Sequence, residues 1–106
     1  MTNSVTKTTL NNGLTVVLKE MHHAPVATFM IWYRMGSRQE KPGLTGVSHW
    51  VEHMMFKGTP EFPNGSLDRL ISREGGHLNA FTWLDFTAYY ETLPSGRINL
   101  ALDVEA

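Results

Sequence analysis

Apolar residues fall into short runs separated by turn residues, and these runs predict the strands of the chain. Residues 5–10 and 14–19 predict a hairpin, because the Asn-Gly pair between them favours a tight turn. Residues 26–35 are almost continuously apolar, which predicts a strand that is buried on both faces and central in its sheet. Residues 77–82 and 86–93 predict a second hairpin with a short connection.

Three other stretches carry helical spacing or helix boundary signals. The first helix is predicted to begin within residues 45–48 and to end at residues 58–60, where a proline follows a glycine. The second begins near Asn64, a favourable N-cap, and ends in a left-handed cap at the glycine pair of residues 75–76. A third helix begins at Ile98. We therefore predict an α+β fold, with a mostly antiparallel sheet and helices packed on one face.

The first helix carries His49, Glu52 and His53 in an H-x-x-E-H pattern. At about 100° per residue, the two histidines point the same way and Glu52 lies beside them. Imidazole nitrogen is a common zinc ligand, and a neighbouring carboxylate can take a proton from the water that attacks a carbonyl. The pattern is the inverted form of the H-E-x-x-H zinc-peptidase motif. The alternative is a helix with two surface histidines and a solvated glutamate, and five letters alone do not decide.

The opposite side of this helix is apolar, so that side is expected to pack into a core while the other carries chemistry. Its apolar residues are Val47, Val51, Met54 and Met55. Elsewhere, His22 and His23 are neighbours in extended chain and point to opposite faces, which predicts exposed loop residues rather than ligands. His77 is an alternative third ligand, although its spacing does not aim it at the helix.

Composition narrows the functional classes. A chain of 106 residues suffices for one small domain, and its net charge of −1, with both signs intermixed, predicts neither nucleic acid nor membrane as a partner. The absence of cysteine leaves histidine and carboxylate as the strong zinc ligands. The N-terminus lacks the features of a signal or transit peptide, and no apolar run approaches the roughly 20 residues that span a bilayer. We therefore expect a cytoplasmic or mature processed protein.

Three blocks along the chain carry a family resemblance. They are residues 12–18, residues 36–40 with 43–59 around the H-x-x-E-H pattern, and residues 75–82 with Asp85, Thr87, Tyr89 and Tyr90. In this order they resemble the pitrilysin and insulinase family of zinc metallopeptidases, which includes the mitochondrial processing peptidases. The resemblance covers nearly the whole chain and is more specific than the five-residue motif.

The resemblance implies a zinc-dependent endopeptidase that hydrolyses peptides or unfolded segments. It implies that His49 and His53 bind zinc, that Glu52 is the general base, and that a third ligand, a glutamate, lies beyond residue 106. It also implies that the edge of one strand pairs with an extended peptide substrate. The residues of that strand are Asn79, Ala80 and Phe81. The alternative for this strand is an ordinary edge strand with a capping asparagine.

Residues 1–106 are expected to be the N-terminal part of a longer peptidase domain, interrupted within the third helix. We expect this part to be inactive and weak for zinc by itself. The expected partners are a peptide substrate and a second copy, a related subunit or the C-terminal half of the protein. The alternative function is a non-catalytic scaffold or partner subunit with the same fold, and the intact motif favours the peptidase.

Overall fold

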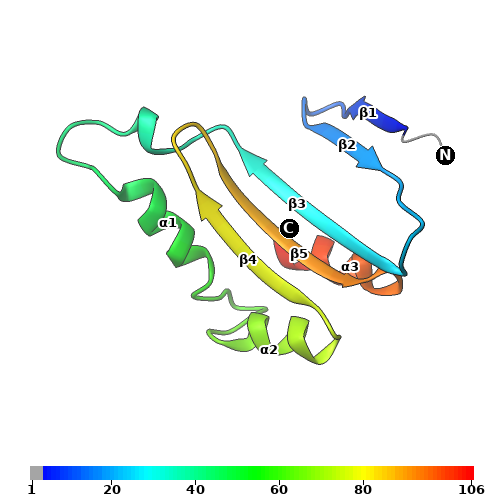
Figure 1. Ribbon diagram of the computed structural model, residues 1–106. Coiled ribbons are helices and arrows are strands. Elements are labelled where there is room, and N and C mark those ends of the chain that lie inside the picture. The colour runs from blue at the N-terminus through cyan, green and yellow to red at the C-terminus, as the bar shows by residue number, and fades with distance from the viewer. Residues whose placement is uncertain (1–3) are drawn as a thin grey trace.

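The computed structural model describes residues 4–106, and Figure 1 shows their arrangement. In chain order the elements are β1 (Val5–Thr9), β2 (Thr15–Lys19), β3 (Val26–Tyr33), α1 (Val47–Met55), α2 (Ser66–Arg73), β4 (His77–Thr82), β5 (Thr87–Pro94) and α3 (Ile98–Glu105), with 3-10 turns at Ser37–Gln39 and Ser95–Arg97. The strands form an antiparallel hairpin, β1-β2, and an antiparallel sheet in the order β3-β5-β4. No helix in residues 4–106 is long and apolar enough to cross a membrane.

The first hairpin confirms the turn predicted between residues 5–10 and 14–19. The N–H of Gly13 donates to the carbonyl of Leu10 at 2.9 Å, and the N–H of Leu10 donates to the carbonyl of Leu14 at 2.8 Å. Gly13 has a φ of +88°, a left-handed conformation that glycine adopts without steric cost. The connection is therefore a turn closed by a left-handed glycine, one of the common three-residue hairpin loops.

The prediction that residues 26–35 form a central strand buried on both faces is wrong. The corresponding strand β3 lies at the edge of its sheet, and side chains such as Trp32 and Met30 are exposed. The central strand is β5, which pairs with β3 on one side and with β4 on the other. No helix in residues 4–106 packs against the face of β3 that carries Met30 and Trp32. The apolar sequence of this strand therefore does not indicate burial on both faces.

All three helices lie on the same face of this sheet, as predicted. Ile71 of α2, Leu93 of β5 and Ala101 of α3 form the core, each at most 1% exposed. Helix α1 contacts Thr82, which pairs with Thr87 of β5 and thus shares a face with Leu93, six residues further along. Figure 1 shows α1 and α2 beside β4 and α3 behind the sheet. The α+β fold with helices on one face is confirmed.

One carboxyl group is buried among these apolar side chains. Glu91 of β5 is 3% exposed, and its Oε2 has no hydrogen-bond partner among the described residues. Burial, together with a hydrogen bond to Glu105 and the charge of that residue, raises the pKa of Glu91 to about 9. Burial thus favours the protonated form of this carboxyl group beneath α3.

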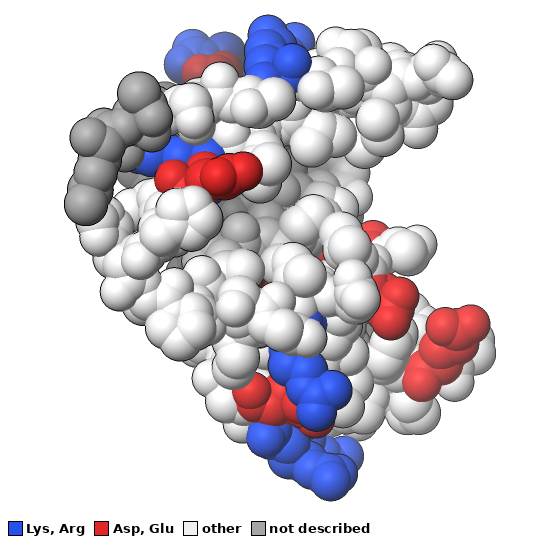
Figure 2. Space-filling model, turned by 90° about the vertical axis from the view of Figure 1, so that its right-hand side faces the viewer, with Lys and Arg blue, Asp and Glu red and all other residues white. Residues whose placement is uncertain are grey.

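The charged groups of the surface are mixed in sign. On the face shown in Figure 2, acidic and basic side chains occur in small groups that are separated by uncharged surface. No extended patch of one sign is visible on that face, in agreement with the net charge of −1.

Helix α2 ends as predicted, although it begins later than expected. Its first residue is Ser66 after an N-cap at Gly65, whereas the sequence favoured Asn64. At the other end, the N–H of Gly75 donates to Ser72 and that of Gly76 to Ile71, which is the Schellman arrangement. The second glycine is required by packing, because a Cβ there would lie 2.2 Å from Leu93 Cδ2 and 2.8 Å from the Thr92 carbonyl oxygen.

We predict that Gly76→Ala destabilises the chain by about 1–3 kcal/mol, because the added methyl group overpacks the junction of α2 and β5. Gly96→Ala is the matched control, since a Cβ at that position meets nothing within 4 Å. Its free energy of unfolding should stay within about 0.5 kcal/mol of the wild type. Urea unfolding measures both, and equal losses in the two variants would contradict this account.

Candidate functional site

Helix α1 begins at a junction that a distant carboxylate stabilises. The N-cap is Gly46, with a φ of +91°, and no side chain within the helix caps it. Instead Glu40 accepts hydrogen bonds from the N–H of Gly46 at 3.1 Å and from the N–H of Ser48 at 2.8 Å. The expected cap within residues 45–48 is therefore replaced by a carboxylate of the preceding loop, which suits the positive end of the helix dipole.

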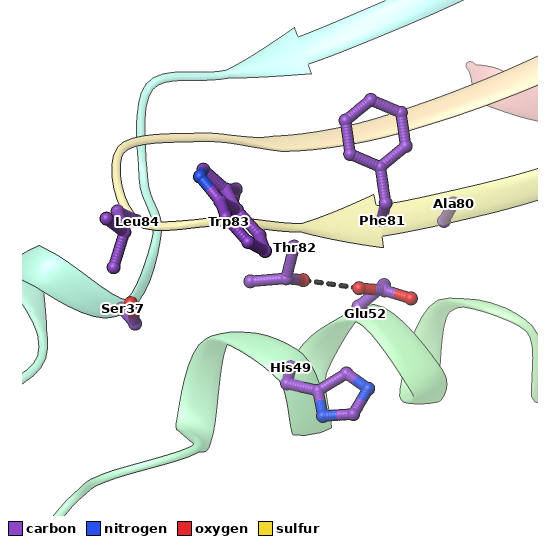
Figure 3. A pocket seen from close by; sticks show the side chains of 8 residues that line it. All are labelled: Ser37, His49, Glu52, Ala80, Phe81, Thr82, Trp83 and Leu84. Carbon is purple, nitrogen blue, oxygen red and sulfur yellow. Dashed lines mark hydrogen bonds between the residues drawn. The ribbon is translucent and has the colours of Figure 1, made fainter.

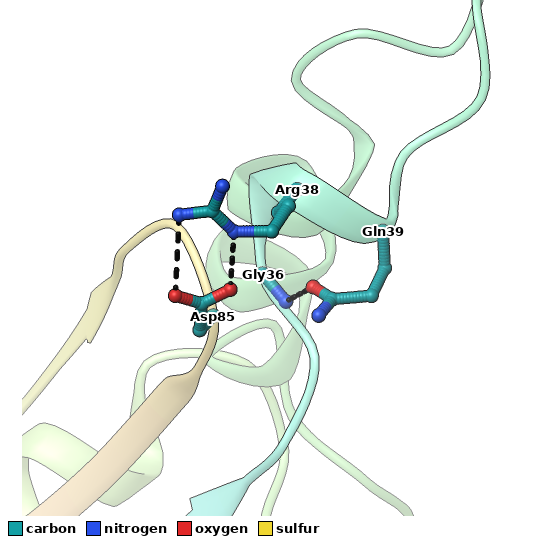
Figure 4. Close-up of polar contacts among 4 residues, drawn as sticks. All are labelled: Gly36, Arg38, Gln39 and Asp85. Atoms are coloured by element: carbon teal, nitrogen blue, oxygen red, sulfur yellow. Dashed lines mark hydrogen bonds and ion pairs between the residues drawn. The ribbon is translucent and has the colours of Figure 1, made fainter.

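The segment of residues 36–40 also binds the turn between β4 and β5. The N–H groups of Ser37 and Arg38 donate to the carbonyls of Trp83 and Leu84 at 3.0 and 2.8 Å. Arg38 and Asp85 form an exposed ion pair at 2.6 Å, shown in Figure 4. One short segment thus connects the start of α1 to the end of β4.

Gly36 lets this segment approach the turn closely. Its N–H donates to Gln39 Oε1 at 2.8 Å, as drawn in Figure 4. A Cβ at Gly36 would lie 2.2 Å from the carbonyl oxygen of Trp83. Only glycine therefore allows the two backbones to approach this far, and the spacing of α1 from β4 depends on that approach.

The two histidines of α1 meet, as the sequence predicts. Nε2 of His49 and Nε2 of His53 face each other at 2.9 Å on the exposed side of the helix, and the ring centroids are 4.6 Å apart. A tetrahedral zinc ion bound through two nitrogens at about 2.0–2.1 Å separates them by about 3.3 Å. The nitrogens need to move apart by only a few tenths of an ångström, so the pair fits a zinc ion. Within residues 4–106, no third histidine, aspartate or glutamate completes the group.

The side chain of Glu52 points toward the sheet, whereas the two imidazoles lie on the exposed side of the helix. It is 8% exposed, faces the sheet and accepts a short hydrogen bond from the hydroxyl of Thr82 at its Oε2, as Figure 3 shows. Burial, followed by the negative charge of Glu52, raises the pKa of the neighbouring Tyr89. Glu52 is therefore held between the helix and the strand, with one oxygen occupied by Thr82.

The apolar side of α1 is not packed, so the prediction that it enters a core is wrong within residues 4–106. Its exposed fractions run from 38% to 51%. The residues are Val47, Val51, Met54 and Met55. Three of them line a hollow of about 390 Å³ together with side chains of β3 and β5. Glu52 contacts the sheet through Thr82, while the apolar side of the helix borders this hollow.

A second hollow, of about 480 Å³, lies between α1 and β4. Its lining, drawn in Figure 3, consists of Ser37, His49, Glu52, Ala80, Phe81, Thr82, Trp83 and Leu84. His49 and Glu52 of the helix thus share one hollow with the strand and with apolar side chains of the turn. Such a mixture of apolar walls and a few polar groups is typical of a ligand site.

Strand β4 lies at the free edge of the sheet, beside α1. Ala80 lies on the same face as Thr82 and so toward the helix, whereas Asn79 and Phe81 lie on the other face. His77 shares that other face, which separates it from the imidazole pair. The structure thus brings Ala80 and Phe81 to the hollow and leaves His77 outside it. His22 and His23 are exposed, as predicted.

Sequence reasoning missed two residues that position this site. Both Thr82 and Glu40 lie within the blocks that carry the family resemblance, but the sequence predicts no role for either. Thr82 had one local signal, because it is two residues after Ala80 and therefore shares its face. Glu40 had none, since its partners lie six and eight residues away across an irregular loop.

The chain is similar to known proteins over most of its length. Residues 15–106 match the family described as insulinase, peptidase family M16. An uncharacterised zinc protease of Streptomyces coelicolor is 40% identical over 101 residues, and a probable mitochondrial-processing peptidase subunit beta of Arabidopsis thaliana is 42% identical over 99 residues. These matches cover 95% and 93% of this chain but only 22% and 19% of the relatives.

A solved structure shows the same fold. The crystal structure of a protease from Helicobacter pylori superposes with a TM-score of 0.91 at 32% identity, over 97% of this chain and 25% of that one. The chain thus spans about a fifth to a quarter of the length of the proteins that it matches.

We predict that Glu40→Gln destabilises the chain at neutral pH and not in acid. The hydrogen bonds from Ser48 and Gly46 hold the pKa of Glu40 below its ordinary value of 4.5. Because the folded-state pKa is lowered, the stabilisation is present above that ordinary value and is lost as the pH falls through the lowered pKa. Urea unfolding at several pH values measures the difference between the two proteins.

The control for this prediction is Glu61→Gln, which changes an exposed loop carboxylate. It should match the wild type across the range. A stability gap for Glu40→Gln that is as large in acid as at neutral pH would show that the carboxylate charge does not stabilise the start of α1.

Proposed function

Because this chain belongs to the insulinase family of peptidases, family M16, we propose that the complete protein is a zinc-dependent endopeptidase. The observation that carries the proposal is the convergence of the Nε2 atoms of His49 and His53 beside a carboxylate held against an edge strand. The relatives named as zinc proteases support the same metal.

We assign the zinc ligands to His49 and His53, with a third ligand, a glutamate, supplied from beyond residue 106. The two imidazoles are exposed and turned toward each other, so they can accept the ion with little movement. When bound, zinc supplies Lewis-acid activation of a water molecule and of the peptide carbonyl. A chain with two such ligands is expected to bind zinc weakly and to be inactive alone, because catalytic zinc sites use three protein ligands.

Glu52 is the proposed general base. It accepts a proton from the attacking water and later donates it to the leaving amine. Thr82 occupies Oε2 of Glu52 and so orients the carboxylate, leaving Oε1 as the proton acceptor. Thr82 is accordingly a positioning residue that acts through Glu52.

The proposed substrate is an extended peptide or an unfolded segment that adds to the free edge of β4. Main-chain pairing of this kind gives affinity without requiring one side-chain sequence. The substrate-binding residues assigned to this edge are Asn79, Ala80 and Phe81, and the main-chain groups of Ala80 point away from β5 toward the incoming peptide. Ala80 and Phe81 line the hollow that also contains Glu52, so a peptide at this edge lies beside the proposed base. A related subunit, a second copy or the remainder of the protein is the proposed partner that completes the site.

We predict that Glu52→Gln in the complete protein lowers peptide hydrolysis by about 10² to 10⁴, the usual loss for a missing general base. The amide keeps nearly the same shape and spares both imidazoles, so zinc content should not change. Turnover of an internally quenched peptide and metal analysis after dialysis are the two measurements.

Glu61→Gln is the matched control, because it makes the same chemical change on an exposed loop and should keep full activity. Wild-type turnover by the Glu52→Gln protein would remove Glu52 from the mechanism. Absence of hydrolysis by the wild-type complete protein would instead favour the non-catalytic scaffold.

A further inference from the structure

The side chain of Asn79 forms a hydrogen bond with the backbone of its own strand. Its Oδ1 accepts the N–H of Ala80 at 2.8 Å. Both residues belong to β4, the edge strand that borders the hollow. The role of this hydrogen bond depends on whether the Ala80 N–H points toward β5 or toward the free edge of the sheet.

That direction follows from the bonds at the ends of the sheet. The N–H of Trp83 donates to the carbonyl of Phe86 at 2.8 Å, so the backbone of Trp83 faces β5. Main-chain groups alternate in direction along a strand, so Asn79 and Phe81 also face β5, and Ala80 faces the free edge.

The pairing between β5 and β3 also indicates that the Ala80 N–H faces the free edge. The N–H of Ser95 donates to the carbonyl of Pro25 at 2.9 Å, just beyond β3. Alternation then turns residues 89 and 91 toward β3 and residues 88 and 90 toward β4, where they pair with Phe81 and Asn79. The N–H of Ala80 is thus an edge donor that no strand of residues 4–106 uses.

We propose that Asn79 is an internal cap that closes the peptide-binding edge of β4 and competes with the incoming peptide for the Ala80 donor. The proposal rests on the proposed function, in which this edge receives the substrate. An added strand needs the Ala80 N–H for its own carbonyl, and the Asn79 oxygen already occupies it.

Such a cap also protects the edge of β4 when no peptide is bound. An exposed edge with unused donors is a template for pairing with other chains, and proteins protect such edges with local side chains. The side chain of Asn79 is exposed, so it can rotate away when a peptide carbonyl takes its place. One net hydrogen bond corresponds to roughly a 2- to 10-fold change in an equilibrium constant, enough to select against weak or transient pairing.

Amide hydrogen exchange in the complete protein tests the cap directly. In Asn79→Ala the Ala80 amide should exchange roughly 2- to 10-fold faster than in the wild type, because its acceptor is gone. In Asn79→Asp the acceptor oxygen remains, so exchange should stay close to the wild type. The Phe81 amide, which faces β5, should not change in either variant.

Peptide affinity in the complete protein tests the competition. In the Glu52→Gln background, which prevents cleavage, Asn79→Ala should bind an unstructured decapeptide of Ala, Ser and Thr roughly 2- to 10-fold more tightly. Asn99→Ala, an exposed change on α3, is the matched control and should leave affinity unchanged.

If the Ala80 amide exchanges equally fast in the wild type and in Asn79→Ala, Asn79 does not cap this donor. If Asn79→Ala binds the peptide no more tightly than the Asn79 protein, Asn79 does not compete with the peptide. Failure of the peptidase proposal is distinguishable, because it shows as absent hydrolysis by the wild-type complete protein and does not depend on Ala80 exchange.

Discussion

The hydrogen bond from Thr82 to Glu52 determines how α1 lies on the sheet. A carboxylate that is 8% exposed is costly without a partner, and Thr82 provides the donor from the facing strand. This pairing sets the rotation of the helix about its axis. The imidazoles of His49 and His53 then lie on the exposed side of the helix, with His49 lining the hollow, and the apolar side of the helix is left exposed.

The segment of residues 36–40 adds a second constraint at the start of the helix. Glu40 holds the first turn of α1, while the backbones of Ser37 and Arg38 are bonded to the turn after β4. The helix is thus fixed in rotation by one contact and in position by another. Both constraints connect the proposed metal ligands to the strand that is proposed to bind peptide, so the two parts of the site are held together.

The parts of the fold that the sequence predicted are those with local causes. The glycine pair ends α2, the Asn-Gly turn closes the first hairpin, and the spacing of His49 and His53 brings their rings together. Strand order and helix rotation are different, because they depend on contacts far apart in sequence. The apolar run of β3 suggested a central strand, but β5 took that place with Glu91 in its buried face.

The same physical reason explains the error on α1. Hydrophobicity favoured burying the side with Val47 and Val51, whereas the observed rotation satisfies the buried Glu52. A helical wheel places Glu52 among the surface groups, because it considers only the helix itself. It contains no information about the hydroxyl of Thr82, which is thirty residues away in the sequence. The sequence names Glu52 as a proposed site residue, but it does not predict the contact with Thr82 that orients this carboxylate.

The assignment of the zinc ligands is the central claim, and X-ray absorption spectroscopy of the zinc-loaded complete protein tests it most directly. The account predicts two imidazole ligands in the wild type, and loss of both the imidazole signal and the bound zinc in the His49→Ala, His53→Ala double variant. The His22→Ala, His23→Ala double variant, which changes two exposed histidines, should keep the wild-type spectrum. An unchanged zinc environment without His49 and His53 would contradict the account.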